Sequence, residues 1–216
     1  MNVNKKIKQI TSGRSFADVG GLWGTENERV TVASLAGACS ATMVDMQRED
    51  NEWWQAFDQH CEEKGVTDYG KIVANIDDAD FTSRVPSHDI VHCSGVIYHS
   101  PNPLRTMAQL RAITANTLLL CSMTVPERMK TKRGVIELPE GHMLSVPALG
   151  DRERTVVASY FDRIGIQVHN INMSGAVPWR VEGDYNYAPW WWLWTPKTLA
   201  RLVETAGFSV SEKLDD

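Results

Sequence analysis

The 216-residue sequence contains no long apolar run and no clustered cysteines. Because a helix needs about 18 or more apolar residues in a row to cross a bilayer, we do not expect a membrane-spanning segment. The first residues, Met1-Asn-Val-Asn-Lys-Lys, are not followed by the apolar region of a secretory signal. The four cysteines form no Cys-x-x-Cys pair, which disfavours a zinc site and a disulfide framework. We therefore expect a protein of the reducing cytoplasm.

Basic residues are too few for a surface that broadly attracts polyanions. The 22 Lys and Arg residues against 27 Asp and Glu residues give a formal net charge of -5. This balance disfavours nucleic acid and anionic membranes as partners, since both bind clustered Lys and Arg, although a local basic patch stays open. Hydrophobic content of 43% and charged content of 23% are ordinary for a globular protein. The length suits one domain, residues 1–216.

Apolar runs alternate with helical periods from residue 15 to about 124, which is typical of a parallel sheet with crossover helices. We expect strands at 15–19, 41–45, 71–74, 89–93 and 117–121. We expect helices at 25–38, from about 50 to Gly65, from Pro101 or Pro103 to about 115, at 151–163, and from Thr195-Pro196 to Gly207. The fifth run, Thr117-Leu-Leu-Leu-Cys121, predicts a strand covered on both faces. The predicted fold is α/β, a doubly wound Rossmann-like sheet.

Residues 125–194 interrupt this alternation. They hold five of the eight tryptophans together with many prolines and glycines. The segment is too long for a simple connection, so we expect an elaboration with its own role, namely a substrate-side insertion after the fifth strand.

Glycines and acidic residues follow the ends of four expected strands. Asp18, Gly20, Gly21 and Gly24 end the first, Asp45 the second, Asp77 and Asp78 follow the third, and Ser94 and Gly95 the fourth. In a doubly wound sheet these ends share the edge where ligands bind. The acid after strand two can accept hydrogen bonds from two ribose hydroxyls, and the acidic turn after strand three can meet an adenine amino group. The glycine loop by itself leaves a cofactor loop and a plain turn equally open.

The ordered series resembles the class I S-adenosylmethionine-dependent methyltransferases over about residues 15–213. The resemblance rests on four motifs: Asp18-Val-Gly20-Gly-Leu-Trp-Gly24, Val44-Asp45, Ile76-Asp77-Asp78 and Asp89-Ile-Val-His-Cys-Ser-Gly95. Two further stretches are similar to one branch of this family, which contains the bacterial enzyme that modifies wobble uridine in transfer RNA. They are Gly95-Val-Ile-Tyr98-His99-Ser-Pro-Asn-Pro103-Leu and Trp-Thr195-Pro-Lys-Thr-Leu with Ala-Gly207-Phe.

The resemblance implies S-adenosyl-L-methionine as the cofactor. It implies that Asp18, Gly20 and Gly24 surround the methionine part, that Asp45 binds the ribose, and that backbone from Cys93 to Gly95 faces the amino-acid end. The full set of expected cofactor-binding residues is Asp18, Gly20, Gly21, Gly24, Asp45, Met46, Asp77, Asp78, Cys93, Ser94 and Gly95.

Three departures from the family pattern bear on this set. Leu22 stands where the family usually has a third glycine, which predicts a displaced entry into the next helix. Pro189-Trp190 stands where the wobble-uridine enzyme, which uses a carboxylated cofactor, has a basic residue; although Tyr98 matches that enzyme, ordinary S-adenosylmethionine is favoured. The family's seventh strand has no counterpart before Asp216, so we expect a shortened sheet or a truncated chain.

His99 is the expected general base, because it follows the fourth strand closely and its ordinary pKa of about 6.5 suits proton removal near neutrality. The alternative is a local role, capping the helix that opens at Pro101 or bonding nearby groups. His92, inside the strand, is expected to point into packing.

Aromatic residues of the insertion form the expected substrate side. Consecutive tryptophans cannot all face one way, so substrate contact and plain packing both stay open. The expected substrate-binding residues are Tyr98, Tyr185, Tyr187, Trp190 and Trp192. Arg180 and His142 are candidate contacts for an anionic group.

The predicted function is methyl transfer to a small molecule, at oxygen. Three alternatives stay open: transfer RNA modification, a non-catalytic binding protein, and an NAD-dependent Rossmann-type oxidoreductase. The last predicts Gly-x-Gly-x-x-Gly, whereas Gly20, Gly21 and Gly24 give Gly-Gly-x-x-Gly. A homodimer also stays open.

Overall fold

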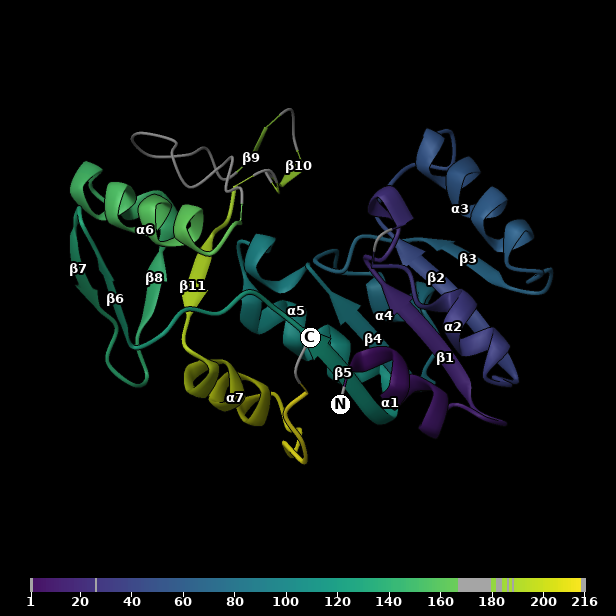
Figure 1. The fold of residues 1–216 in the computed structure, drawn as a ribbon. Coiled ribbons are helices and arrows are strands. Elements are labelled where there is room, and N and C mark those ends of the chain that lie inside the picture. The colour runs from purple at the N-terminus through teal and green to yellow at the C-terminus, as the bar shows by residue number, and fades with distance from the viewer. Residues whose placement is uncertain are drawn as a thin grey trace. The chain divides into compact units, whose positions relative to one another are not determined.

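The computed structural model describes residues 2–25, 27–166, 180–181, 184–185, 187 and 189–214. The chain forms two compact units (Figure 1). We call the first the sheet unit; it comprises Met1–Val96, Leu104–Ser122 and Phe208–Asp216. The second, the hairpin unit, comprises Ile97–Pro103 and Met123–Gly207. Most of the hairpin unit is therefore the segment that the sequence sets apart as an insertion.

The sheet unit is built on a five-stranded sheet with the order β3-β2-β1-β4-β5. All four pairings are parallel. The strands are β1 (Ser15–Val19), β2 (Ser40–Asp45), β3 (Gly70–Val73), β4 (His88–Ser94) and β5 (Thr114–Cys121). The five predicted strands and the doubly wound topology are confirmed. The chain leaves β1 for β2 on one side and returns to β4 on the other, so the order reverses between β1 and β4.

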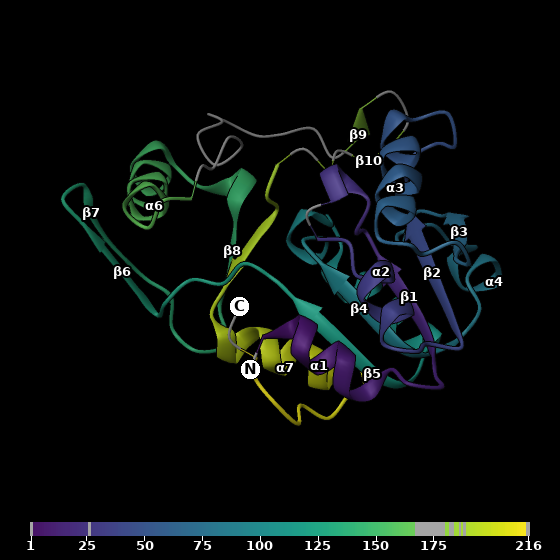
Figure 2. The ribbon, with the colours of Figure 1, turned by 45° about the vertical axis from the view of Figure 1, so that its right-hand side comes forward.

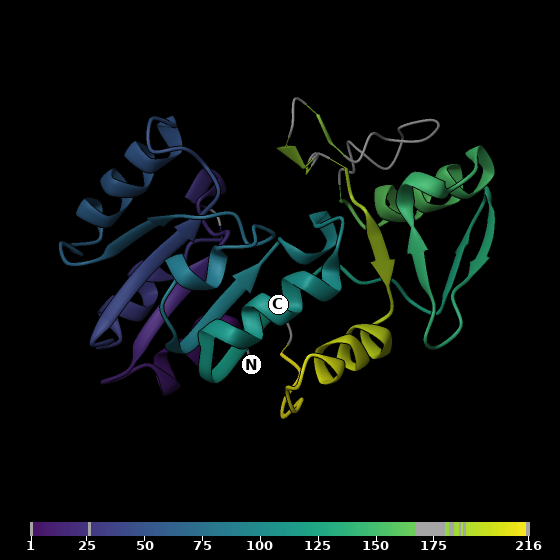
Figure 3. The same cartoon turned by 180° about the vertical axis from the view of Figure 1, so that it is seen from behind.

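Helices cover both faces of this sheet. They are α1 (Val3–Ile10), α2 (Val30–Leu35), α3 (Glu52–Glu63), α4 (Phe81–Arg84) and α5 (Pro103–Ile113). α1, α2 and α3 share a core with one sheet face, built around Phe16, Met43 and Ile90. α1 and α2 lie in front of the sheet in Figure 1, and α5 lies in front when the molecule is seen from behind in Figure 3. α3 buries Trp54, Phe57 and Cys61, the face predicted from their helical spacing.

Two expectations for the sheet unit are wrong in detail, and one helix was not predicted. The helix expected at 25–38 begins only at Val30, after the short 3-10 helix η1 (Trp23–Thr25), because Leu22 is fully buried and turns the chain inward. This agrees with the displaced helix entry expected at Leu22. β5 is an edge strand, and Leu118 and Leu120 are only partly buried rather than covered on both faces. The helix that was not predicted is α1, which Asn2 caps by accepting a hydrogen bond from the Lys5 N–H.

The hairpin unit packs a helix against a two-stranded hairpin, as Figure 2 shows. Its strands are β6 (Arg128–Thr131), β7 (Gly134–Glu137), β8 (Met143–Ser145), β9 (Arg180–Val181), β10 (Asp184–Tyr185) and β11 (Trp192–Trp194). Its helices are η2 (Ile97–His99), η3 (Val146–Ala148), α6 (Asp151–Arg163) and α7 (Pro196–Thr205). Val157, Phe161, Trp190 and Leu193 form the centre of its core. The helices predicted at 151–163 and after Thr195-Pro196 are confirmed.

Beyond α7, residues 208–214 contain no strand. Among the described residues, no helix is both long enough and apolar enough to span a membrane.

Candidate active site

The loops after β1 and β4 meet at the reversal point of the sheet. Gly20 has a φ of +78°, a conformation that glycine adopts without strain, and its N–H donates to the Val44 carbonyl at 2.9 Å. A Cβ on Gly20 would overlap Cγ2 of Val96, which follows Gly95. Only a glycine lets these two loops approach so closely. Close packing therefore determines the conformation of Gly20–Gly24, which we call the glycine turn. It lies at the carboxyl edge of the sheet, the edge where the parallel strands end.

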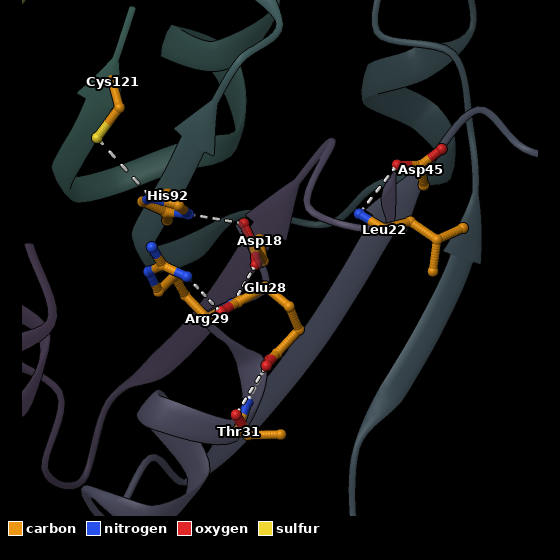
Figure 4. A network of polar contacts seen from close by, with 8 residues as sticks. All are labelled: Asp18, Leu22, Glu28, Arg29, Thr31, Asp45, His92 and Cys121. Atoms are coloured by element: carbon orange, nitrogen blue, oxygen red, sulfur yellow. Dashed lines mark hydrogen bonds and ion pairs between the residues drawn. The ribbon is translucent and has the colours of Figure 1, made fainter. Parts of the chain in front are cut away.

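Asp18 lies close to this turn and belongs to a network of polar contacts, which Figure 4 shows. Its Oδ2 accepts a hydrogen bond from the Arg29 N–H at 2.6 Å, and its Oδ1 lies 2.7 Å from Nδ1 of His92. Both charged side chains are 0% exposed. A Cβ on Gly21 would lie 2.5 Å from Oδ2 of Asp18. These contacts favour a supporting role for Asp18 over direct contact with a ligand.

His92 is buried, as the sequence predicts, but it lies in an ion pair rather than in apolar packing. Its Nε2 lies 4.0 Å from Sγ of Cys121 on β5. Burial lowers the pKa of His92, but the neighbouring charge and hydrogen bond of Asp18 outweigh it and raise the pKa to about 9. The ring is therefore an imidazolium at neutral pH.

Asp45 ends β2 at the same edge. Its Oδ1 accepts from the Gln47 N–H at 3.0 Å, and its Oδ2 accepts from the Leu22 N–H at 3.4 Å. Burial raises the pKa of Asp45, while these backbone donors oppose the rise. The Met46 N–H is a third backbone donor to this carboxylate, which has about four acceptor positions and so retains room for a hydroxyl donor of a ligand. Met46, the next residue, is 43% exposed.

The acidic turn after β3 places its two carboxylates differently. Asp77 is buried, and its Oδ1 accepts from Oγ1 of Thr106 on α5 at 2.7 Å. Asp78 is partly exposed, and its carbonyl accepts from Nε2 of Gln109 at 2.9 Å. Asp78 is thus the more accessible of the two at the carboxyl edge.

Sequence reasoning missed a further buried acid, Glu28, in the connection between β1 and α2. Glu28 is 3% exposed and accepts hydrogen bonds from the N–H and the Oγ1 of Thr31, which fixes the first turn of α2. Its Oε2 also lies 3.2 Å from Nε2 of His60 on α3. Burial raises the pKa of Glu28. The spacing Glu28-x-x-Thr31 before an apolar run was the only available signal.

Four of the residues predicted for catalysis and substrate binding lie close together in the hairpin unit: Tyr98, His99, Trp190 and Trp192. The Trp191 N–H donates to the Tyr98 carbonyl at 2.8 Å, and Nε1 of Trp192 donates to the Pro101 carbonyl at 3.3 Å. The ring of Trp190 lies edge-on to Tyr98 at a centroid distance of 5.1 Å. Trp190 is 9% exposed and packs against Phe161 as well, so much of its surface belongs to the core.

His99 lies among these rings, 4.5 Å from the Tyr98 ring and 6.5 Å from the Trp190 ring by centroids. Its Nδ1 donates to the Pro189 carbonyl at 3.2 Å, a contact 90 residues away in sequence. This hydrogen bond is not local in sequence, while the choice between a base and a structural role for His99 stays a prediction. Burial lowers the pKa of His99, although the carbonyls of Pro189 and Tyr187 oppose the change. In the neutral Nδ1–H tautomer, the lone pair is on Nε2.

The remaining candidates contribute less. Tyr187 is partly buried, and the side chains of Arg180 and Tyr185 lie outside the described part of the chain. His142 is exposed, with Nδ1 3.3 Å from the Glu140 carbonyl oxygen. Among the described residues, no group of three or more His, Cys, Asp or Glu side chains could hold a metal ion.

Comparison with known proteins identifies the family. A model of the methyltransferase domain matches residues 12–213. The chain belongs to this family. As a member, it is an S-adenosylmethionine-dependent methyltransferase. A comparison with curated proteins finds no match.

A solved structure with a TM-score of 0.60 shows the same fold. The methyltransferase is similar to a protein named as a methyltransferase from Bacillus halodurans C-125, with a TM-score of 0.60 and 15% identity over 97% of this chain and 70% of the other. It is also similar to the partner of the Trm112 methyltransferase activator of Haloferax volcanii (TM-score 0.47, 16% identity, 96% and 68% coverage). A third is coclaurine N-methyltransferase bound to N-methylheliamine and SAH (TM-score 0.43, 16% identity, 53% and 32% coverage).

The carboxyl edge of the methyltransferase suits its cofactor. Asp45 offers carboxylate oxygens at the end of β2, where hydroxyl donors can be accepted. Gly20 and Gly95, both with positive φ, bring backbone close together at the reversal point. The residues present therefore fit a nucleoside with an amino-acid extension.

Proposed function

We propose that this methyltransferase acts on a small molecule at a hydroxyl oxygen, with His99 as the general base. The observation that carries the proposal is the environment of the His99 ring. Burial lowers its pKa, so the imidazole is neutral near pH 7 and can accept a proton. The bond from Nδ1 to the Pro189 carbonyl selects the tautomer in which Nε2 is the base.

The rings around His99 suit a planar acceptor. Tyr98 and Trp190 offer apolar faces, and burial raises the pKa of Tyr98, which keeps its hydroxyl neutral. Tyr98 and His99 follow Gly95, the first residue after β4, by three and four residues in the chain. An overall negative charge supports a small acceptor over a nucleic acid.

We assign the cofactor contacts as follows. Asp45 would accept hydrogen bonds from the ribose hydroxyls, Asp78 would meet the adenine amino group, and backbone near Gly20 and Ser94 would face the amino-acid end. When bound, S-adenosylmethionine supplies a methyl group on a sulfonium sulfur, and the carbon–sulfur bond breaks as the acceptor oxygen takes the methyl. Nε2 of His99 takes the hydroxyl proton of the acceptor.

Two variants test the base. His99→Ala removes the ring, and His99→Gln keeps a polar side chain of similar length that cannot accept a proton at neutral pH. Both should lower turnover by about two to four orders of magnitude, the range for a lost general base, and both should bind S-adenosylhomocysteine like the wild type in calorimetry. Wild-type turnover in His99→Gln would remove His99 from the mechanism.

The acceptor class needs a separate assay. We would follow S-adenosylhomocysteine release with a panel of hydroxylated aromatic compounds and, in parallel, with bulk transfer RNA. Turnover on members of the panel supports the proposal. Turnover on transfer RNA alone, with binding that weakens steeply as salt rises, would replace it with RNA modification.

A further inference from the structure

Among the described residues of the sheet unit, His92 and Asp18 form an ion pair in which both side chains are fully buried (Figure 4). The two residues are direct neighbours across the parallel pairing of β4 and β1. Nδ1 of His92 and Oδ1 of Asp18 lie 2.7 Å apart. Removing one partner of such a pair leaves an uncompensated charge in the core, so the two groups depend on each other strongly.

Asp18 links this pair to the glycine turn. Its Oδ2 accepts from the Arg29 N–H at 2.6 Å, which holds the chain where α2 begins. The same oxygen would lie 2.5 Å from a Cβ on Gly21, so the carboxylate directly underlies the turn. A shift of the carboxylate would therefore move both ends of the connection between β1 and α2.

We propose that His92 is a positioning residue for cofactor binding: it holds the Asp18 carboxylate in place and thereby fixes the shape of the glycine turn. The proposal concerns the cofactor side of the site and does not depend on the nature of the methyl acceptor. It adds a residue of the strand interior to the acids and glycines that end the strands.

Electrostatics explain why a histidine is needed at this position. Burial raises the pKa of Glu28 and of Asp45, and the negative charge of Asp18 raises both pKa values further. Three carboxyl groups therefore interact near the turn. His92 brings a positive charge into the core beside one of them, since its pKa is raised to about 9. Among the described residues, the titratable and charged groups of this network are Asp18 on β1, Cys93 on β4, Cys121 on β5, Arg29 before α2 and, through Asp18, Glu28 and Asp45.

A matched pair of histidines on β4 allows a clean test. His92→Asn keeps a donor near the position of Nδ1 but removes the titrating charge. The control is His88→Asn, because His88 is also buried on β4 but bonds the Pro86 carbonyl instead of an acid. S-adenosylhomocysteine affinity would be measured by calorimetry for both variants and the wild type from pH 7 to pH 10.

The affinity for S-adenosylhomocysteine should fall between pH 7 and pH 10 in the wild type and in His88→Asn, because the His92 imidazolium loses its proton. This fall should be roughly tenfold larger than the fall in His92→Asn. The amino group of the ligand titrates equally in all three proteins, so the difference between profiles isolates His92. At pH 7, His92→Asn should bind roughly tenfold more weakly than the wild type. Equal affinity at pH 7, or identical pH profiles in His92→Asn and the wild type, would overturn the proposal.

A second measurement is independent of the cofactor. Ring NMR of the unliganded protein should show that His92 titrates near pH 9 through its contact with Asp18. A His92 ring that is neutral at pH 7 would also overturn the proposal, whatever the acceptor of the enzyme.

Discussion

The substitution Gly21→Ala tests how tightly the glycine turn packs on Asp18. The added Cβ would lie 2.5 Å from Oδ2, 2.8 Å from Cγ and 3.0 Å from Oδ1 of that carboxylate. Ordinary carbon contacts lie near 3.5–4.0 Å, so about 1 Å of movement is required. The φ of Gly21 is not positive, and any loss of stability therefore reports space rather than backbone strain.

The size of the effect follows from what must move. The Asp18 carboxylate is 0% exposed and has bonds of 2.6 Å to Arg29 and 2.7 Å to His92, so it cannot retreat without lengthening them. Overpacking a core costs about 1–3 kcal/mol, and breaking a buried ion pair costs about 3–5 kcal/mol. We expect Gly21→Ala to lower the free energy of unfolding by about 3 kcal/mol.

Urea unfolding followed by far-UV circular dichroism would measure this change. Gly150→Ala is the matched control, because its Cβ would lie 2.7 Å from Oε2 of Glu153, the mobile end of an exposed side chain. Gly150 precedes α6 as its N-cap, so this change should cost about 1 kcal/mol or less. Equal losses in the two variants would refute the tight packing of the turn on Asp18.

Two further predictions concern the hairpin unit. Trp190→Ala should lower the free energy of unfolding by about 3–5 kcal/mol, because the Trp190 ring is 9% exposed and packs on Phe161. Trp192 is partly exposed, so Trp192→Ala should lower it by about half as much or less. Equal losses for the two variants in urea unfolding would contradict this difference. Turnover should fall at acid pH with a midpoint below the ordinary histidine pKa of about 6.5, because burial lowers the pKa of His99 and protonation removes the base. This acid limb should be absent from the residual activity of His99→Gln. A wild-type midpoint above pH 7 would argue against His99.

The ends of the strands could be predicted from the sequence because local chemistry determines them. Asp45 closes an apolar run and Gly20 follows one, and both patterns are visible without knowledge of the fold. The sheet order β3-β2-β1-β4-β5 then brings these ends to one edge, as expected for a doubly wound sheet.

The contacts inside the sheet could not be predicted in the same way. His92 stands in an apolar strand, and only the register with β1 reveals that it faces Asp18. Leu118 and Leu120 suggest a covered strand, but hydropathy does not say that β5 lies at an edge. α1 is a short helix that depends on packing, which the sequence expresses weakly.

Cofactor binding at the carboxyl edge of the sheet is the central claim, and Asp45 tests it most directly. Calorimetric titration with S-adenosylhomocysteine should show saturable binding by the wild type and binding at least about tenfold weaker by Asp45→Asn, which loses a charge-assisted acceptor. Asp50→Asn is the control, because Asp50 is 75% exposed and forms an ion pair with Arg48 at the surface. Its affinity should match the wild type. Wild-type affinity in Asp45→Asn would contradict the assignment of the carboxyl edge as the cofactor site.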